Sequence, residues 1–247
     1  MDMQLKQQFT ERWSSYFPGA ELPVVFYYTD EPEKVERAVP RGRQCLICDL
    51  AQVRCGASRA FDVDAVGCAG GKRYLGFVQE LRPGFNYFLS CGIPGEMEGE
   101  RYKKTPALVE EIMNRMPAFQ APGRYIVFKR WDAMDETDEP AAVVFFSPPD
   151  VLSGLFTLAG YDELDAQAVI APFGSGCASI VYHPYLELAS PQPRAVLGMF
   201  DVSARPCVPA NVLTFAVPWP KFARMVENMD ESFLITGSWA AVRRRIM

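Results

Sequence analysis

Strand-type and helix-type segments alternate along the whole chain, and this alternation restricts the fold more than any other feature. Runs rich in β-branched and aromatic residues, such as PVVFYYTD (23–30) and AAVVFF (141–146), are typical of buried strands. Near the N-terminus, apolar side chains with helical spacing fall on one helix face: Leu5, Phe9, Trp13 and Tyr16. The interleaving predicts an α/β or α+β fold, with one or more layered mixed sheets and flanking helices.

The same signals place the other elements. Further strands are predicted at 61–66, 85–90, 124–131, 168–171, 194–200 and 211–217. Further helices are predicted at 44–54, from Thr105 and Pro106 onward, and at 148–160, 220–229 and 238–246. The acidic segment 132–140 is expected to be a solvated surface loop.

Length and charge limit the class of protein. A chain of 247 residues, 49% of them hydrophobic, suits a single compact domain over 1–247. The formal net charge of −5 argues against nucleic acid as a partner, because phosphate capture needs clustered Lys and Arg. We find no apolar run long enough for a membrane span and no signal-peptide core, so we expect a cytoplasmic protein with reduced thiols and no membrane partner. The sequence is compatible with a homo-oligomer as well as with a monomer.

Short segments in the two halves of the chain are similar in sequence. Val24-Val25-Phe26 resembles Val143-Val144-Phe145, and the triplet Gly67-Cys68-Ala69 resembles Gly176-Cys177-Ala178. These matches predict two pseudo-symmetric lobes, 20–131 and 141–230, in which Cys68 and Cys177 are equivalent. A small-molecule or metal ligand would then lie between the lobes, since pockets favour such junctions.

Four cysteines near the N-terminus form the main candidate site: Cys45, Cys48, Cys55 and Cys68. Thiolates are the ligands that zinc and iron–sulfur clusters prefer. The spacing C-x2-C-x6-C-x12-C matches no zinc-ribbon or ferredoxin pattern, however. Buried inert thiols and reactive thiols therefore stay open as alternatives.

Two glycine-rich turns are candidates for binding an anionic part of a ligand through backbone N–H groups. The first contains Gly70, Gly71 and Lys72, and its spacing excludes a P-loop. The second contains Gly174, Ser175 and Gly176, for which a loop with positive φ is the simpler explanation. Arg205, which follows a predicted strand, is a third candidate for an anionic ligand.

Several segments together resemble the uncharacterised ArCR family, a domain family common in archaea and anaerobic bacteria. They are PVVFYYTD, QCLICDLA, VGCAGGKRYLGF, FGSGCASIVYHPY and DVSARPCVPANVLTFAVPWPKFARMVENM, spanning about residues 23–230. The resemblance implies Cys48, Cys68 and Cys177 as site residues before Cys45, Cys55, Cys91 or Cys207. It implies no reaction.

The sequence therefore predicts a pocket in which Cys48, Cys68 and Cys177 hold a metal, an iron–sulfur cluster or a small cofactor, with Cys45 as a fourth thiolate. One alternative is a thiol enzyme with one of these cysteines as nucleophile. The other is a structural or interaction protein with inert cysteines. Sequence alone does not establish whether the protein is an enzyme.

Overall fold

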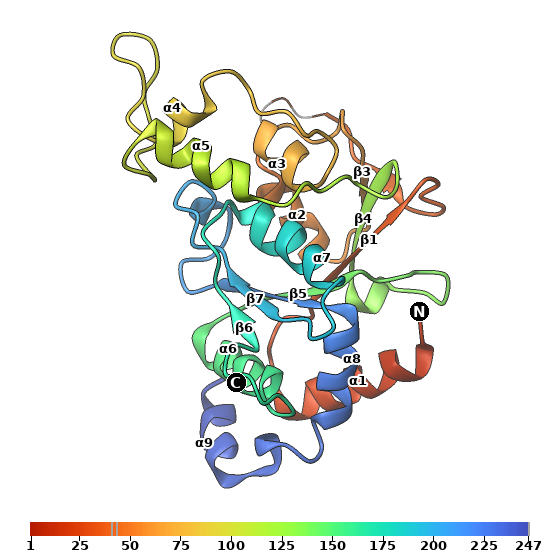
Figure 1. Ribbon diagram of the computed structural model, residues 1–247. Helices are drawn as coiled ribbons and strands as arrows, with labels where there is room; N and C mark the ends of the chain where they lie inside the picture. Colours follow the sequence, from red (N-terminus) through yellow and green to blue (C-terminus); the bar gives the residue numbers. More distant parts are fainter. Residues whose placement is uncertain (41, 43, 247) are drawn as a thin grey trace.

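One mixed sheet organises the computed structural model, which describes residues 1–40, 42 and 44–246. In the described residues the sheet has eight strands in the order β2-β3-β4-β1-β5-β8-β7-β6 (Figure 1). Their bounds are β1 Val24–Thr29, β2 Glu36–Arg37, β3 Arg59–Phe61, β4 Tyr125–Arg130, β5 Ala142–Ser147, β6 Val169–Ile170, β7 Ala195–Gly198 and β8 Leu213–Pro218. The predicted α/β class, with a layered mixed sheet and flanking helices, is confirmed.

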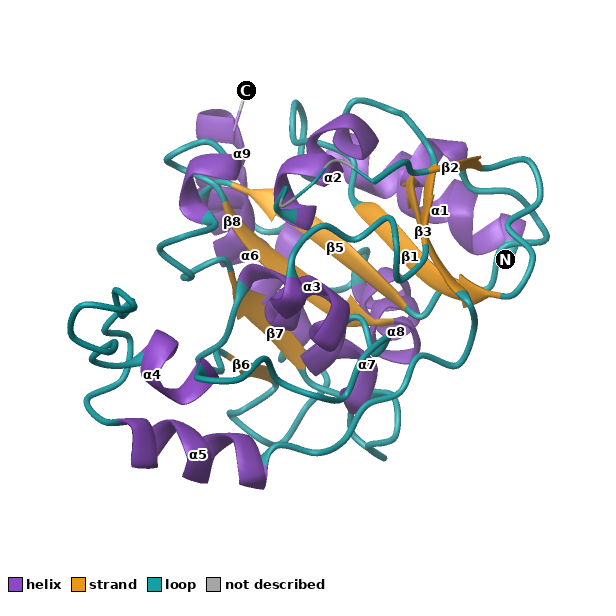
Figure 2. Cartoon of the chain, turned by 90° about the horizontal axis from the view of Figure 1, so that it is seen from above, coloured by secondary structure: helices purple, strands orange, loops and turns teal. Residues whose placement is uncertain are grey.

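Helices cover both faces of the sheet. One face carries α2 (Leu46–Arg54), α3 (Ala69–Tyr74), the π-helical turn η2 (Ala178–Tyr182) and α7 (His183–Glu187) (Figure 2). The other carries α1 (Met3–Tyr16), α6 (Pro149–Ala159), α8 (Trp219–Asn228) and α9 (Gly237–Ile246). None of the described helices combines the length and the apolar character needed to cross a membrane.

The central strands are apolar on both sides because each face is buried. Val24 and Phe26 of β1 point to the α2 face, while Val25 between them points to the α1 face. Such two-residue alternation follows from the pleat of a strand. Continuous apolar runs such as VVF are therefore required at the centre of this sheet.

Two predicted strands are wrong. The strand predicted at 61–66 ends where it should begin, because β3 is Arg59–Phe61 and residues 62–66 form a turn in which Asp62 accepts the N–H groups of Asp64 and Ala65. Residues 85–90 form the short helix α4 (Phe85–Leu89). It lies in an arm that also contains α5 (Pro106–Arg115) and projects from the body (Figure 1). Gly84 has a φ of 74°, and its carbonyl accepts the N–H of Phe88, which closes a helical turn. Far from the sheet, this apolar segment has no strand to pair with, so its local turn decides its structure.

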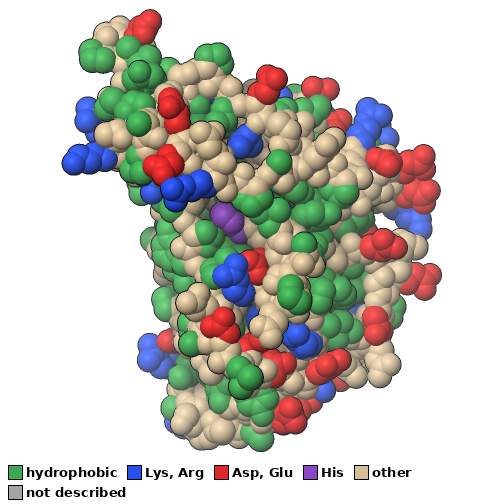
Figure 3. Space-filling view, viewed as in Figure 1, with side chains coloured by type: hydrophobic (Ala, Val, Ile, Leu, Met, Phe, Trp, Pro, Cys, Tyr) green, Lys and Arg blue, Asp and Glu red, His purple; other side chains and the backbone are tan. Residues whose placement is uncertain are grey.

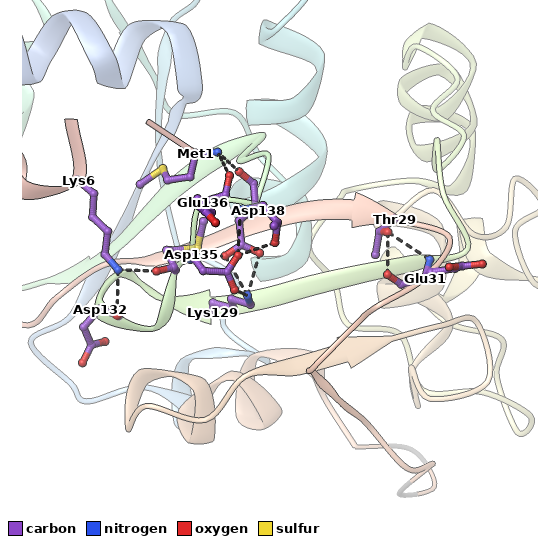
Figure 4. A network of polar contacts seen from close by, with 11 residues as sticks. Met1, Lys6, Thr29, Glu31, Lys129, Asp132, Asp135, Glu136 and Asp138 are labelled. Carbon is purple, nitrogen blue, oxygen red and sulfur yellow. Dashed lines mark hydrogen bonds and ion pairs between the residues drawn. The ribbon is translucent and has the colours of Figure 1, made fainter. Parts of the chain in front are cut away.

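The acidic loop 132–140 is also less exposed than predicted. Asp138 is buried and its two carboxylate oxygens accept hydrogen bonds from Lys129 of β4, at 2.8 and 2.9 Å (Figure 4). The amino group of Met1 donates to the carbonyls of Glu136 and Asp138. Because a buried ammonium group needs a partner, the loop folds back over the α1 face instead of extending into solvent.

Candidate functional site

Five of the seven cysteines lie on the α2 face of the sheet, where segments distant in sequence meet. Cys45 precedes α2, Cys48 lies in its first turn, and Cys68 precedes α3. Cys177 directly precedes η2, and Cys207 ends the 3-10 turn η3 (Arg205–Cys207). The remaining two, Cys55 and Cys91, are exposed.

The sulfur of Cys68 contacts the segments that begin α2, α3 and η2. It accepts hydrogen bonds from the thiol of Cys177 and from the backbone N–H groups of Leu46 and Gly71, the latter at 3.1 Å. Leu46 and Gly71 belong to the first turns of α2 and α3, whose free N–H groups stabilise negative charge. Cys45 is close enough to interact electrostatically with both Cys68 and Cys177.

These contacts shift the pKa values of the thiols in different directions. The hydrogen bond from Cys177, with help from Gly71 and Leu46, lowers the pKa of Cys68 to about 6 although burial opposes the shift. The same bond, together with burial, raises the pKa of Cys177 well above its usual value. Burial also raises the pKa of Cys45. At neutral pH Cys68 is therefore the thiolate of the pair, and Cys177 holds the proton.

Cys48 and Cys207 form a disulfide that joins positions 159 residues apart in the chain, with their Cα atoms 4.8 Å apart. This corrects the expectation that all thiols are reduced. The resemblance ranked Cys207 below Cys48, Cys68 and Cys177 as a site residue. In the structure Cys207 lies at the candidate site, because η3 packs beside α2. Sequence spacing gave no reason to select Cys207.

The predicted ligand set is therefore only partly assembled. Cys45, Cys68 and Cys177 lie together, whereas Cys48 is bound to Cys207. Within the described residues, no three His, Cys, Asp or Glu side chains are arranged to hold a metal ion. The single histidine, His183, follows η2.

The first glycine-rich turn supports the thiols directly. Residues 69–74 form α3 itself, so Gly71 donates to the Cys68 sulfur from inside the helix. A Cβ at Gly71 would lie 3.0 Å from that sulfur and 2.8 Å from the Val66 side chain, so a larger residue there would have to displace its neighbours. Gly70 has open space around it, and Lys72 is half-buried on the same helix.

The second turn brings a carboxylate to the site. Gly176 donates its N–H to Asp201 at 3.1 Å, and the hydroxyl of Ser175 accepts the N–H of Ala178. Neither Gly174 nor Gly176 has a positive φ, which corrects the expected conformation. They are needed for close packing instead, because Cβ atoms there would lie 3.0 Å from Ala178 and Ile47 respectively.

Arg205 has a structural role in this fold. Its guanidinium donates to the backbone carbonyls of Pro209, Ala210 and Val212, which closes the loop after η3. Arginine is well suited to satisfying several carbonyls at once. The side chain predicted to bind an anionic ligand therefore holds the segment that carries Cys207.

A cavity of about 170 Å³ lies elsewhere, beside the edge strand β6, where Phe156, Leu164 and Val169 line it. It contains one well-buried carboxylate, Glu163, which is already paired with Lys221 and Arg224 at 3.0 and 2.7 Å. It has no cysteine. The chemistry of the molecule is concentrated at the thiols, so we assign the candidate site there.

Comparison with known proteins agrees with the resemblance seen in the sequence. A search of curated proteins and a search of solved structures each found no match. Residues 20–228 match the DUF169 family, described as uncharacterised ArCR. That range contains β1 to β8 and all five clustered cysteines. The match covers most of the chain, and the protein therefore belongs to the uncharacterised ArCR family.

Proposed function

We propose that the cysteine cluster binds a soft metal centre, an iron–sulfur cluster or a zinc ion, when its thiols are reduced. The observation that carries this proposal is the mutual contact of Cys45, Cys68 and Cys177 on the α2 face, where the Cys48–Cys207 disulfide joins α2 to η3. Thiolates are the preferred ligands of both kinds of centre. A histidine-rich metal site is excluded, because the chain has one histidine.

The surroundings of Cys68 support a ligand role. Metal thiolates and cluster sulfurs are stabilised by N–H donors, and Cys68 already accepts two from helix first turns. Cys177 is buried among apolar side chains of η2 and the sheet, which would keep water away from a bound centre. Three of the five thiols, Cys45, Cys68 and Cys177, are free, and reduction of the Cys48–Cys207 disulfide would release the other two.

The test is to purify the full chain without oxygen and with reductant, and to measure iron, zinc and acid-labile sulfide per chain. We expect a stoichiometric metal content, with charge-transfer absorbance if the metal is iron. Cys68→Ser and Cys177→Ser should lose it, whereas Cys55→Ser and Cys91→Ser should retain it, because those two thiols are exposed and lie outside the cluster. Metal-free wild-type protein, also after supply of iron, sulfide or zinc, would contradict the proposal.

A second candidate function, thiol–disulfide exchange, is favoured by the Cys48–Cys207 disulfide beside the hydrogen-bonded Cys68–Cys177 pair. The thiolate is the attacking species in such exchange, and Cys68 is held in that form. This function predicts that reduced, metal-free protein reduces a small disulfide, and that Cys68→Ser abolishes the reaction. A wild-type rate equal to that of Cys68→Ser would exclude it.

A further inference from the structure

Cys68 and Cys177 are free thiols that contact each other although they come from distant parts of the chain. Cys68 precedes α3, and Cys177 lies in the helical turn that runs into η2. The S–H of Cys177 donates to the sulfur of Cys68. A Cβ at Gly71 would lie 3.0 Å from the Cys68 sulfur and 4.0 Å from the Cys177 sulfur, so both pack against one residue without a side chain. The fold thus brings a second pair of cysteines together.

The two sulfurs of this pair have different surroundings. Cys68 is half-buried, and its sulfur accepts the N–H groups of Gly71 and Leu46 in addition to the S–H of Cys177. Such donors stabilise a negatively charged sulfur, which is the form that attacks an electrophile. Cys177 is 3% exposed and lies in the apolar core of the α2 face. Cys68 is therefore the sulfur that a small oxidant reaches, and Cys177 is the thiol behind it.

Other free thiols lack this combination of contacts. Cys91 is exposed, and its thiol donates to the carbonyl of Gly92, a contact that favours the uncharged form. Cys45 lies near both sulfurs of the pair, and its influence on them is electrostatic. An accessible sulfur with stabilised charge, next to a second thiol, is typical of cysteines that peroxides oxidise reversibly.

We propose that Cys68 reduces hydroperoxides when the protein holds no metal, with Cys177 as the thiol that resolves the oxidised sulfur. A hydroperoxide is small enough to react at a half-buried sulfur, and its electrophilic oxygen needs no binding pocket of its own. The proposal goes beyond the metal site, because it concerns the thiols without a bound metal. It shares Cys68 as nucleophile with thiol–disulfide exchange and differs from it in the oxidant.

The reaction has two steps. The Cys68 thiolate attacks one oxygen of the hydroperoxide, the oxygen–oxygen bond breaks, and the sulfur becomes a sulfenic acid while hydroxide or an alkoxide leaves. The Cys177 thiol then attacks that sulfur, a sulfur–sulfur bond forms, and the hydroxyl leaves as water with the proton of Cys177. The two sulfurs together lose two electrons, which the peroxide gains. A dithiol reductant restores both thiols by exchange.

The test uses the full chain, reduced, freed of metal by a chelator and transferred to reductant-free buffer without oxygen. Hydrogen peroxide is added in equimolar amount at neutral pH, free thiols are alkylated, and the peptides are mapped by mass spectrometry. We expect a Cys68–Cys177 disulfide in wild type. In Cys177→Ser, Cys68 should stop at the sulfenic acid, which dimedone captures. Cys68 should react at least about tenfold faster than Cys91 of the same chain, because only the first has its charge stabilised.

Cys91→Ser is the matched control, because it removes an exposed thiol outside the pair and should react like wild type. Circular dichroism checks the folding of Cys177→Ser, and the wild-type peptide map tests the proposal without any variant. Oxidation of Cys68 no faster than that of Cys91 overturns the inference. A wild-type disulfide from Cys68 to Cys45 overturns the role of Cys177.

These outcomes are separate from those for the proposed function. Protein that binds metal but does not react with peroxide at Cys68 overturns this inference alone. Protein that never binds metal but forms the Cys68–Cys177 disulfide overturns the metal site and supports this inference. Reduction of a small disulfide without reduction of peroxide supports exchange and overturns the peroxide reaction.

Discussion

His183 is a half-buried base whose pKa links the stability of the protein to pH. Its Nε2 atom is buried and has no hydrogen-bond partner among the described residues, although part of the side chain reaches the surface beneath the arm (Figure 3). Burial lowers the pKa of His183 to about 4, against the opposing charge of Glu187. The imidazole is therefore neutral at pH 7, and folding favours the neutral form.

This predicts a stability loss in mild acid. The imidazole of His183 binds a proton near pH 6.5 in the unfolded chain and near pH 4 in the folded chain. The stability that the neutral imidazole contributes is therefore fully present above pH 6.5 and declines as the pH falls to 4. The decline is at most about 3 kcal/mol. Urea unfolding of wild type and His183→Gln at pH 7, 5.5 and 4.5 measures it. The variant, which has no titrating group there, should show the shallower dependence; parallel curves would show that His183 contributes nothing.

At the scale of elements, the turn into α3 holds the thiol site against the segment before α2. A Cβ at Gly67 would lie 2.3 Å from the carbonyl oxygen of Gly42 and within 2.9 Å of backbone atoms of Gln44. Backbone atoms cannot move aside singly, so a side chain at 67 has to push the whole segment away. Gly70, three residues later, has no neighbouring atom within 4 Å of such a Cβ.

The two glycines therefore make a matched pair for mutation. We expect Gly67→Ala to lower the free energy of unfolding by about 1–3 kcal/mol, since it overpacks a closed contact. Gly70→Ala should leave it unchanged or raise it by up to about 1 kcal/mol, because alanine favours the helix. Chemical denaturation checks both values. Similar losses in the two variants would show that the close approach at Gly67 carries no stability.

At the scale of the whole molecule, the Cys48–Cys207 disulfide ties the first half of the chain to the second. It closes a loop of 159 residues and so restricts the unfolded chain strongly. In metal-free protein, reduction should lower the free energy of unfolding by about 2–5 kcal/mol. Thermal unfolding with and without reductant tests this, with Cys48→Ala as the control that reductant should not affect. An unchanged wild-type melting temperature would contradict the prediction.

Most elements were predictable because their signals are local. The strands at 23–30, 124–131 and 141–146 are apolar runs that suit burial on both faces, and the helix after Thr105 has its cap and its proline in adjacent positions. The segment 85–90 was not predictable in this way. Its composition is that of a strand, yet it lies in the arm, where no strand is beside it.

The grouping of cysteines at the candidate site was only partly predictable. The sequence singles out Cys68 and Cys177 as candidates, and the structure brings these two thiols into contact. The place of Cys207 does not follow from its spacing to other cysteines.

The sequence by itself determined the alternation of strands and helices, the apolar faces of each and the family to which the chain belongs. These depend on composition and spacing within short segments, where local physical preferences act. Only the tertiary structure decided which thiols meet. Cys68 contacts Cys177, and Cys48 contacts Cys207, because the strand order brings the connections before and after β3 against those around β7. Strand order is set by packing between residues far apart in the chain, which no local pattern records.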